Sequence, residues 1–178
     1  HVPRVTEGVY TTQRLLNADV LSCLKRQALL INASRGQVLH EHDLLEHTHF
    51  DLVLDVFPNE PVIGDALISR CWRISPHIAG YSAEGKYRGT KQILEQAASK
   101  FGFGLNEIDE GAILESAAGS RPVCDTHVEA ILRACPMTET DRALRESVFR
   151  AFEMEKPKLF DETRKSYPLR RESEIYPL

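Results

Sequence analysis

Two short runs of apolar residues constrain the fold of this chain more than any other feature. Residues 28–32 read ALLIN and residues 52–56 read LVLDV, and both are continuous rather than alternating. Continuous runs of this length are typical of parallel strands that are covered on both faces. A shorter run, WRI at residues 72–74, leads into a loop in the same way. We therefore expect three strands of one parallel sheet.

Helical patterns separate these runs. Residues 17–24 begin at Asn17, a suitable N-cap, and residues 41–47 and 66–70 read as short helices. An alternation of helix and strand predicts a parallel sheet with helices on its faces. Right-handed crossovers then bring the carboxyl ends of all three strands to one edge of the sheet.

A long helix follows the last strand, and the chain then changes character. The pattern predicts that this helix starts at Ser82 and stops at Gly102. Residues 105–122 have no clear period, and two amphipathic helices follow at residues 128–134 and 143–152. We expect residues 105 onward to form a separate module that is cut short at its end.

Composition excludes several classes of protein. The formal charge is −4 and no dense run of Lys or Arg is present, so we expect no nucleic-acid partner. The apolar runs are too short to cross a bilayer, so we expect no membrane partner. Four cysteines stand far apart without a C-x-x-C pair, which favours reduced thiols in the cytoplasm over a disulfide framework or a zinc site.

Several histidines and basic residues have simpler interpretations than a site. The four histidines between His40 and His49 lack acidic or Cys partners at ligand spacing, so we expect a solvated face and no metal. Lys86 and Arg88 stand near a helix start, where either a substrate phosphate or solvent is a suitable partner. We interpret Arg171, like its neighbour Arg170, as surface charge.

Three ionisable residues follow the ends of the three strands: Arg35, Glu60 and His77. The planar guanidinium of Arg35 matches a carboxylate, and so suits an α-hydroxy or α-keto acid. His77 is able to take a hydroxyl proton as hydride leaves, and Glu60 would fix its tautomer by bonding the other ring nitrogen. The alternative is that His77 is an ordinary surface histidine.

The segments LLINASRGQVL, LVLDVFPNEP and SPHIAGYS resemble the second half of the nucleotide-binding domain of D-2-hydroxyacid dehydrogenases. HIAGYSAEGKYRGTKQI and FDETRKSYPLRRES are closer to one member, which oxidises 4-phospho-D-erythronate to the 2-oxo acid in pyridoxal phosphate synthesis. The resemblance implies NAD as cofactor, a phosphorylated 2-hydroxy acid as substrate and a homodimer. It also implies that Arg35, Glu60 and His77 are catalytic, with His77 the proton donor.

The resemblance also implies which residues contact ligands. Tyr81 matches a position that contacts substrate, while His40 and Phe57 stand where the family usually has Asp and Trp. The residues that match the NAD site are Val2, Ala33, Ser34, Arg35, Asp55 and Gly80.

By this resemblance the fold is α/β: the second half of a Rossmann-like parallel sheet, a long helix and a small α+β module of dimerisation type. The expected domains are 1–81, the carboxyl-terminal half of the NAD-binding domain, 82–104, the helix, and 105–178, the dimerisation-like module. The family's G-x-G-x-x-G turn is absent from these 178 residues, so we expect a carboxyl-terminal portion of an enzyme. The alternatives are another D-2-hydroxyacid dehydrogenase, of glycerate or phosphoglycerate type, and a non-catalytic binding or dimerisation remnant.

Overall fold

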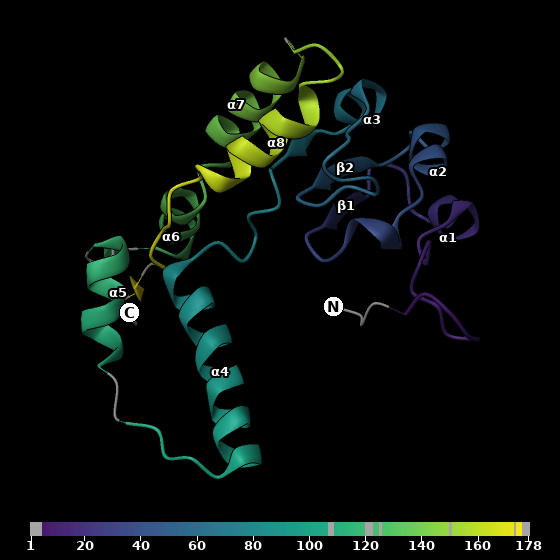
Figure 1. The fold of residues 1–178 in the computed structure, drawn as a ribbon. Helices are drawn as coiled ribbons and strands as arrows, with labels where there is room; N and C mark the ends of the chain where they lie inside the picture. Colours follow the sequence, from purple (N-terminus) through teal and green to yellow (C-terminus); the bar gives the residue numbers. More distant parts are fainter. Residues whose placement is uncertain are drawn as a thin grey trace. The chain divides into compact units, whose positions relative to one another are not determined.

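The computed structural model describes residues 5–106, 109–119, 123–124, 126–149, 151–172 and 174–175. Their contacts divide the chain into two compact units (Figure 1). Unit 1 contains the described residues of His1–Ala79 and Met137–Tyr167, and unit 2 contains those of Gly80–Pro136 and Pro168–Leu178.

Three parallel strands form the centre of unit 1, in the order β1-β2-β3. They are β1 (Leu29–Asn32), β2 (Asp51–Leu54) and β3 (Arg73–Ile74). Asn32 lies opposite Leu54, and Leu54 lies opposite Ile74, so the three carboxyl ends are level at one edge. The α/β class and the parallel sheet predicted from the sequence are therefore confirmed.

Helices pack around this sheet and bury its core. They are α1 (Ala18–Ser22), α2 (Glu41–Glu46), α3 (Asp65–Arg70), α7 (Met137–Phe149) and α8 (Lys156–Lys165), with a short 3-10 helix, η1, at Gly36–Val38. The predicted N-cap of α1 is confirmed, because Asn17 Oδ1 accepts a hydrogen bond from Val20 N at 3.2 Å. Leu44, Ile68 and Leu144 are fully buried between these elements.

Strand β1 differs from its prediction. The sequence predicts a strand covered on both faces, but Leu29 is 49% exposed and Ile31 is 60% exposed. The physical reason is that β1 lies at the edge of the sheet, and no helix of the described chain covers this face.

The opposite edge of the sheet is covered by α7. Asp141 is 7% exposed, and its Oδ1 accepts hydrogen bonds from Ile74 N in β3 at 2.8 Å and from Arg145 Nε at 2.9 Å. Arg145 also donates to the carbonyl oxygens of Ile68 and Cys71, both at 2.8 Å. Burial raises the pKa of the Cys71 thiol to about 12, so the thiol is neutral here. Residues 137–165, which the sequence assigned to the separate module, thus pack in unit 1.

Replacing Asp141 with Ala should destabilise unit 1, because the Ile74 N–H loses its acceptor and Arg145 loses its counter-charge. We expect a loss of about 3 kcal/mol in the free energy of unfolding, measured by urea denaturation. Arg142→Ala, an exposed position on the same helix, is the control and should stay within about 0.5 kcal/mol of the parent chain. Equal losses in the two variants would show that the Asp141 contact is not what stabilises this edge.

Unit 2 is organised around the long helix α4 (Ala83–Phe101). Ser82 Oγ accepts from Gly85 N at 3.0 Å, and Gly102 ends the helix with a φ of 71°, so both predicted ends are confirmed. The chain then reverses, and α5 returns alongside α4 (Figure 1). The other elements are α5 (Glu110–Ala118), β4 (Val123–Cys124), α6 (His127–Ala134) and β5 (Glu174–Ile175), with β4 and β5 parallel.

A buried ion pair links residues 171–172 to the first turn of α4. Glu84 is 0% exposed, and its carboxylate accepts from Arg171 Nε at 2.7 Å and from Glu172 N at 2.9 Å. Arg171 Nη1 also donates to the carbonyl oxygen of Gly119 at 2.6 Å. The interpretation of Arg171 as surface charge is therefore wrong: the sequence does not show the buried carboxylate 87 residues earlier that it neutralises.

The Glu84 carboxylate should make the stability of unit 2 sensitive to acid. Burial by itself raises the pKa of Glu84, but the hydrogen bonds from Arg171 and the Glu172 N–H outweigh it, so the pKa lies below its usual range. A carboxyl of this kind stabilises the fold fully above its unfolded pKa of about 4.3, and the stabilisation is lost as pH falls through the lower folded pKa. In acid titrations followed by circular dichroism, Glu84→Gln should be less stable than the parent at pH 7. The difference in stability between the two proteins should shrink below about pH 4. A difference that stays constant with pH would contradict the prediction.

Candidate functional site

The loop after β1 is shaped by a buried asparagine. Asn32 is 4% exposed; its Oδ1 accepts from Ser34 N at 3.1 Å and from Ser34 Oγ at 2.8 Å, and its Nδ2 donates to the carbonyl oxygen of Arg35 at 2.9 Å. Gly36 follows, and a Cβ there would lie 1.8 Å from the carbonyl oxygen of Phe57. Only glycine therefore lets this loop pack against the loop after β2. The arrangement leaves Ala33 exposed and Ser34 half-buried at the strand end.

Arg35 leaves this loop toward solvent. Its side chain is exposed, and Nη1 donates to the carbonyl oxygen of Ser34 at 2.9 Å. Within the described residues the structure shows no hydrogen bond or ion pair from Arg35 to Glu60 or His77. The guanidinium thus keeps most of its donors available for an anionic ligand.

In the loop after β2, the side chain of Glu60 is held by a backbone N–H group of the same loop. Glu60 Oε1 accepts from Phe57 N at 2.7 Å, so one carboxylate oxygen is fixed within the turn itself. Phe57 is 2% exposed, and its ring packs edge-on against Phe160 of α8, with 6.0 Å between the ring centroids. The turn that carries Glu60 is thereby anchored to the core.

His77 meets Glu60 across 17 residues of sequence. The distance from His77 Nδ1 to Glu60 Oε2 is 2.8 Å, and the two side chains are 30% and 20% exposed. Since an ionised carboxylate only accepts hydrogen bonds, Nδ1 carries the proton and Nε2 is the free acceptor of the neutral ring. The pair predicted from the sequence is thus brought into contact, with Nε2 left to exchange protons.

The backbone at His77 is unusual. Its φ is 56°, in the left-handed region that residues with a Cβ seldom adopt. His77 N donates to the carbonyl oxygens of Asp55 at 2.7 Å and Ser75 at 3.0 Å. The carboxylate of Asp55, 5% exposed, accepts from Ser75 Oγ, Ile78 N and Ala79 N at 2.6, 2.8 and 2.9 Å. Asp55 therefore organises the whole loop that carries His77.

Three further residues are predicted to contact cofactor or substrate. Val2 lies outside the described residues. Gly80 and Tyr81 belong to unit 2, where a Cβ on Gly80 would meet nothing within 4 Å. The Nζ of Lys86 lies 3.5 Å from the centroid of the Tyr81 ring, a close cation–π contact. Contacts of all these residues with cofactor or substrate stay predictions.

Sequence reasoning missed the buried polar residues that shape the site. Asn32 ends an apolar run and Ser75 follows one, and neither position was assigned a role. A polar residue at the end of a buried strand is itself a usable indication, because its side chain must find hydrogen bonds inside the protein. For Asn32 the partners are local, whereas the partner of Ser75 is on another strand.

The histidines between His40 and His49 do have an acidic neighbour, contrary to the expectation from the sequence. His40 Nδ1 lies 3.0 Å from Asp43 Oδ1, and this hydrogen bond lowers the pKa of the Asp43 carboxyl. No group of three or more His, Cys, Asp or Glu side chains in the described chain has a metal-binding arrangement. The described helices also include none with the length and apolar character of a membrane span.

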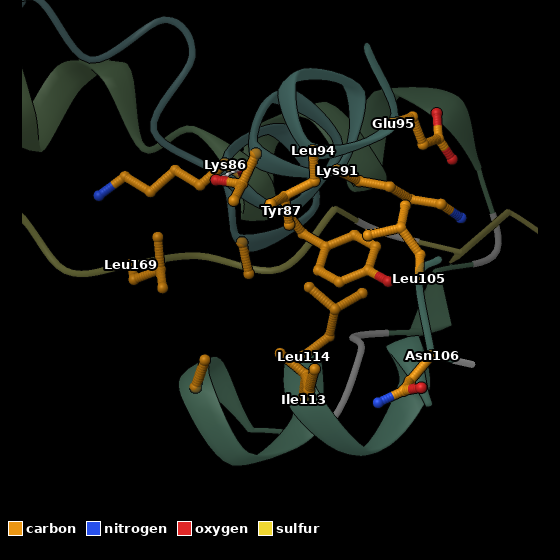
Figure 2. Close-up of a pocket in the computed structure, with 13 residues that line it drawn as sticks. Lys86, Tyr87, Lys91, Leu94, Glu95, Leu105, Asn106, Ile113, Leu114 and Leu169 are labelled. Carbon is orange, nitrogen blue, oxygen red and sulfur yellow. Dashed lines mark hydrogen bonds between the residues drawn. The ribbon is translucent and has the colours of Figure 1, made fainter. Parts of the chain in front are cut away.

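Unit 2 has a pocket of its own, with a volume of about 720 Å³. Figure 2 shows the ring of Tyr87 at its centre, with Leu114 and Ile113 of α5 facing it. Lys86 and Lys91 reach toward opposite sides of the pocket (Figure 2). Its lining is mainly apolar, and none of the catalytic residues predicted from the sequence lines it. We therefore place the candidate active site at the strand ends of unit 1.

Comparison with known proteins identifies the family that this chain resembles. Residues 5–79 match the family model of the NAD-binding domain of D-isomer-specific 2-hydroxyacid dehydrogenases. The chain is 37% identical over 97% of its length to an erythronate-4-phosphate dehydrogenase of Acinetobacter baumannii, of which it covers 49%. It is 35% identical over 100% of its length to one of Teredinibacter turnerae, of which it covers 50%. The chain thus spans about half the length of these curated relatives.

Solved structures are also similar. One is an NADPH-dependent glyoxylate/hydroxypyruvate reductase of Sinorhizobium meliloti in complex with NADP and malonate, at 30% identity and a TM-score of 0.48, covering 61% of this chain and 35% of that chain. Another is an NAD-dependent formate dehydrogenase of Staphylococcus aureus in complex with NAD, at 27% identity and a TM-score of 0.43, covering 62% and 34%.

The match to an NAD-binding domain confirms NAD as the cofactor predicted from the sequence. Three of the residues predicted to contact this cofactor lie at the strand ends of unit 1. The β1 loop offers a small exposed side chain at Ala33 and a hydroxyl at Ser34, and Asp55 lies at the end of β2. A glycine-rich turn for the pyrophosphate is not among the 178 residues.

Replacing Glu60 with Gln should allow the neutral ring of His77 to adopt both tautomers. The amide keeps the shape of the side chain but offers a donor as well as an acceptor, so the Nδ1 proton is no longer required. In ¹⁵N NMR spectra of the neutral ring, the parent should show one tautomer protonated at Nδ1. Glu60→Gln should show a mixture, whereas Glu46→Gln, on the surface of α2, should match the parent. A parent ring protonated at Nε2 would contradict the assignment.

Proposed function

We propose that this chain, which belongs to the D-isomer-specific 2-hydroxyacid dehydrogenase family, carries the acid–base residues of an NAD-dependent oxidoreductase. The reaction is the oxidation of a 2-hydroxy acid to the 2-oxo acid. The observation that supports it most directly is the 2.8 Å contact between His77 Nδ1 and Glu60 Oε2, at the edge where the strands end. A polarised histidine in this place is what removal of a hydroxyl proton requires.

Each of the three residues has a distinct role in this proposal. His77 Nε2 accepts the proton of the substrate hydroxyl and returns it in the reverse direction. Glu60 holds the ring by Nδ1–H and stabilises the imidazolium that forms. Arg35 binds the substrate carboxylate through its planar fork. When bound, NAD supplies the acceptor for the hydride that leaves C2. The residues that would contact NAD are Ala33, Ser34, Arg35, Asp55 and Gly80, together with Val2 through its backbone or by packing.

For the substrate we propose 4-phospho-D-erythronate, which would place the protein in pyridoxal phosphate synthesis. The support is the name of the relatives, erythronate-4-phosphate dehydrogenase, with 34 to 37% identity over nearly the whole chain. Tyr81 would contact this substrate. D-Glycerate and 3-phosphoglycerate, the substrates of the alternative dehydrogenases, differ from it in length or in the phosphate and are the competitors to compare.

We also propose a homodimer in the cytoplasm. Unit 2 exposes large apolar side chains on α4, with Ile93 69% exposed and Phe101 72% exposed, and such side chains favour association. The dimerisation-like module proposed for residues 105–178, after the helix of residues 82–104 and the NAD-binding half at 1–81, would then be confined to the part of 105–178 that belongs to unit 2, because residues 137–165 pack in unit 1. The four free cysteines support a reducing compartment.

The test is His77→Asn in the full-length protein that contains this chain, because Asn keeps polarity but exchanges no proton. Turnover of 4-phospho-D-erythronate should fall by about 10²–10⁴-fold. The dissociation constant of NADH, measured by fluorescence titration, should change less than about threefold, since His77 acts on substrate.

Other outcomes have separate meanings. Undiminished turnover in His77→Asn would overturn the mechanism. Faster turnover of D-glycerate or 3-phosphoglycerate by the parent protein would reassign the substrate within the family. NADH binding without turnover of any of the three acids would favour the non-catalytic alternative.

A further inference from the structure

We propose that Asp55 is a positioning residue for His77, whose buried carboxylate holds residues 75–79 in the conformation that presents the imidazole to Glu60. This role is additional to the cofactor contact predicted for Asp55. The kinetic part of its test rests on the proposed function, whereas the structural part does not.

The first support is the number of donors that Asp55 receives from this one loop. Oδ1 accepts from Ser75 Oγ at 2.6 Å and from Ile78 N at 2.8 Å, and Oδ2 accepts from Ala79 N at 2.9 Å. The carbonyl oxygen of Asp55 accepts from His77 N at 2.7 Å. One residue at the end of β2 thus contacts the loop on both sides of His77.

The second support is the backbone conformation that these bonds maintain. His77 has a φ of 56°, which is unfavourable for a residue with a Cβ and persists only where surrounding contacts impose it. The loop gains those contacts from Asp55, since successive N–H groups at residues 77, 78 and 79 all point to it. These bonds are therefore among the contacts that hold the backbone of His77 in this conformation.

The third support is the division of labour between two carboxylates. Asp55 bonds the backbone on which His77 is carried, and Glu60 bonds the ring. Asp55 and Glu60 both belong to the segment that follows β2, so the backbone and the ring of His77 are held by the same segment. Placement of Nε2 to within a fraction of an ångström requires both, because a displaced loop would move the ring out of reach of Glu60.

The chemistry at Asp55 requires a carboxylate. All three partners of its oxygens are donors, and Asn would turn an N–H₂ group toward at least one of them. Asp55→Asn therefore keeps size and shape but replaces one hydrogen bond by a donor facing a donor. Asp51→Asn is the matched control, since Asp51 is exposed at the start of the same strand.

The test compares the parent, Asp55→Asn and Asp51→Asn in the full-length protein. For Asp55→Asn, peptides spanning residues 75–79 should exchange amide hydrogens at least about tenfold faster, and the His77 ring should lose its single tautomer. The kcat should fall about 10–100-fold, with KM for the 2-hydroxy acid within about threefold of the parent, whereas any change in the NADH dissociation constant reports the separate cofactor contact of Asp55. Asp51→Asn should match the parent in every measurement.

Two results would overturn the proposal. One is weaker NADH binding in Asp55→Asn with unchanged kcat and unchanged exchange, which would leave Asp55 a cofactor contact alone. The other concerns Ser75→Ala, the variant to use if Asp55→Asn does not fold: unchanged exchange at residues 75–79 and unchanged kcat there would overturn it. If the parent turns over no 2-hydroxy acid, the proposed function fails, and exchange and tautomer still decide the role of Asp55.

Discussion

Because β1, β2 and β3 run parallel and end in register, three loops of unrelated sequence must share one edge of the sheet. Everything that the site does depends on this constraint. It brings Glu60 to His77 although 17 residues separate them, and it packs the Gly36 backbone against Phe57. An antiparallel arrangement would send alternate loops to opposite edges and separate these groups.

Crowding three loops at one edge creates a demand for buried hydrogen-bond acceptors. Loops carry backbone N–H groups that no strand pairs, and an unpaired buried N–H is costly. Asn32 accepts from a backbone N–H of its own loop, and Asp55 accepts from backbone N–H groups of the loop after β3. Asp141, on a helix 67 residues later, accepts from the N–H of Ile74 in the outer strand. The polar residues in the core of unit 1 are therefore the reason that its strand ends have defined shapes.

The parts of the structure that follow local rules are the parts that the sequence predicts. Asn17, Ser82 and Gly102 mark helix ends through their own side chains or φ angle, so the short range of the interaction makes them readable. The contact of Glu60 with His77 is long-range, yet it follows once parallel topology is assumed. The exposure of β1 does not follow, because burial depends on what covers a strand and not on its composition.

Long-range pairing of single residues is what the sequence does not reveal. The sequence around Arg171 is typical of a surface cation, and no nearby residue indicates that it pairs with the buried Glu84. Helix α8 has a highly charged sequence, and only the packing of Phe160 on Phe57 shows that one face belongs to the core. Helix α5 has Asp109 as N-cap, a local feature that the irregular stretch around it obscured.

The residues of the candidate site differ in how firmly they are held before the proposed substrate binds. Glu60 and His77 are held by the backbone of Phe57 and by Asp55, so the geometry needed for the proposed proton transfer is present without a ligand. Arg35 is exposed and bonds its neighbour's carbonyl, so its side chain must lose rotamer freedom when it binds a carboxylate. The favourable charge-assisted pairing of a substrate carboxylate offsets that entropy loss, while an uncharged alcohol offers no such compensation. On this argument, the proposed preference for 2-hydroxy acids over simple alcohols depends on the exposed Arg35, and the proposed proton transfer depends on the pair of Glu60 and His77.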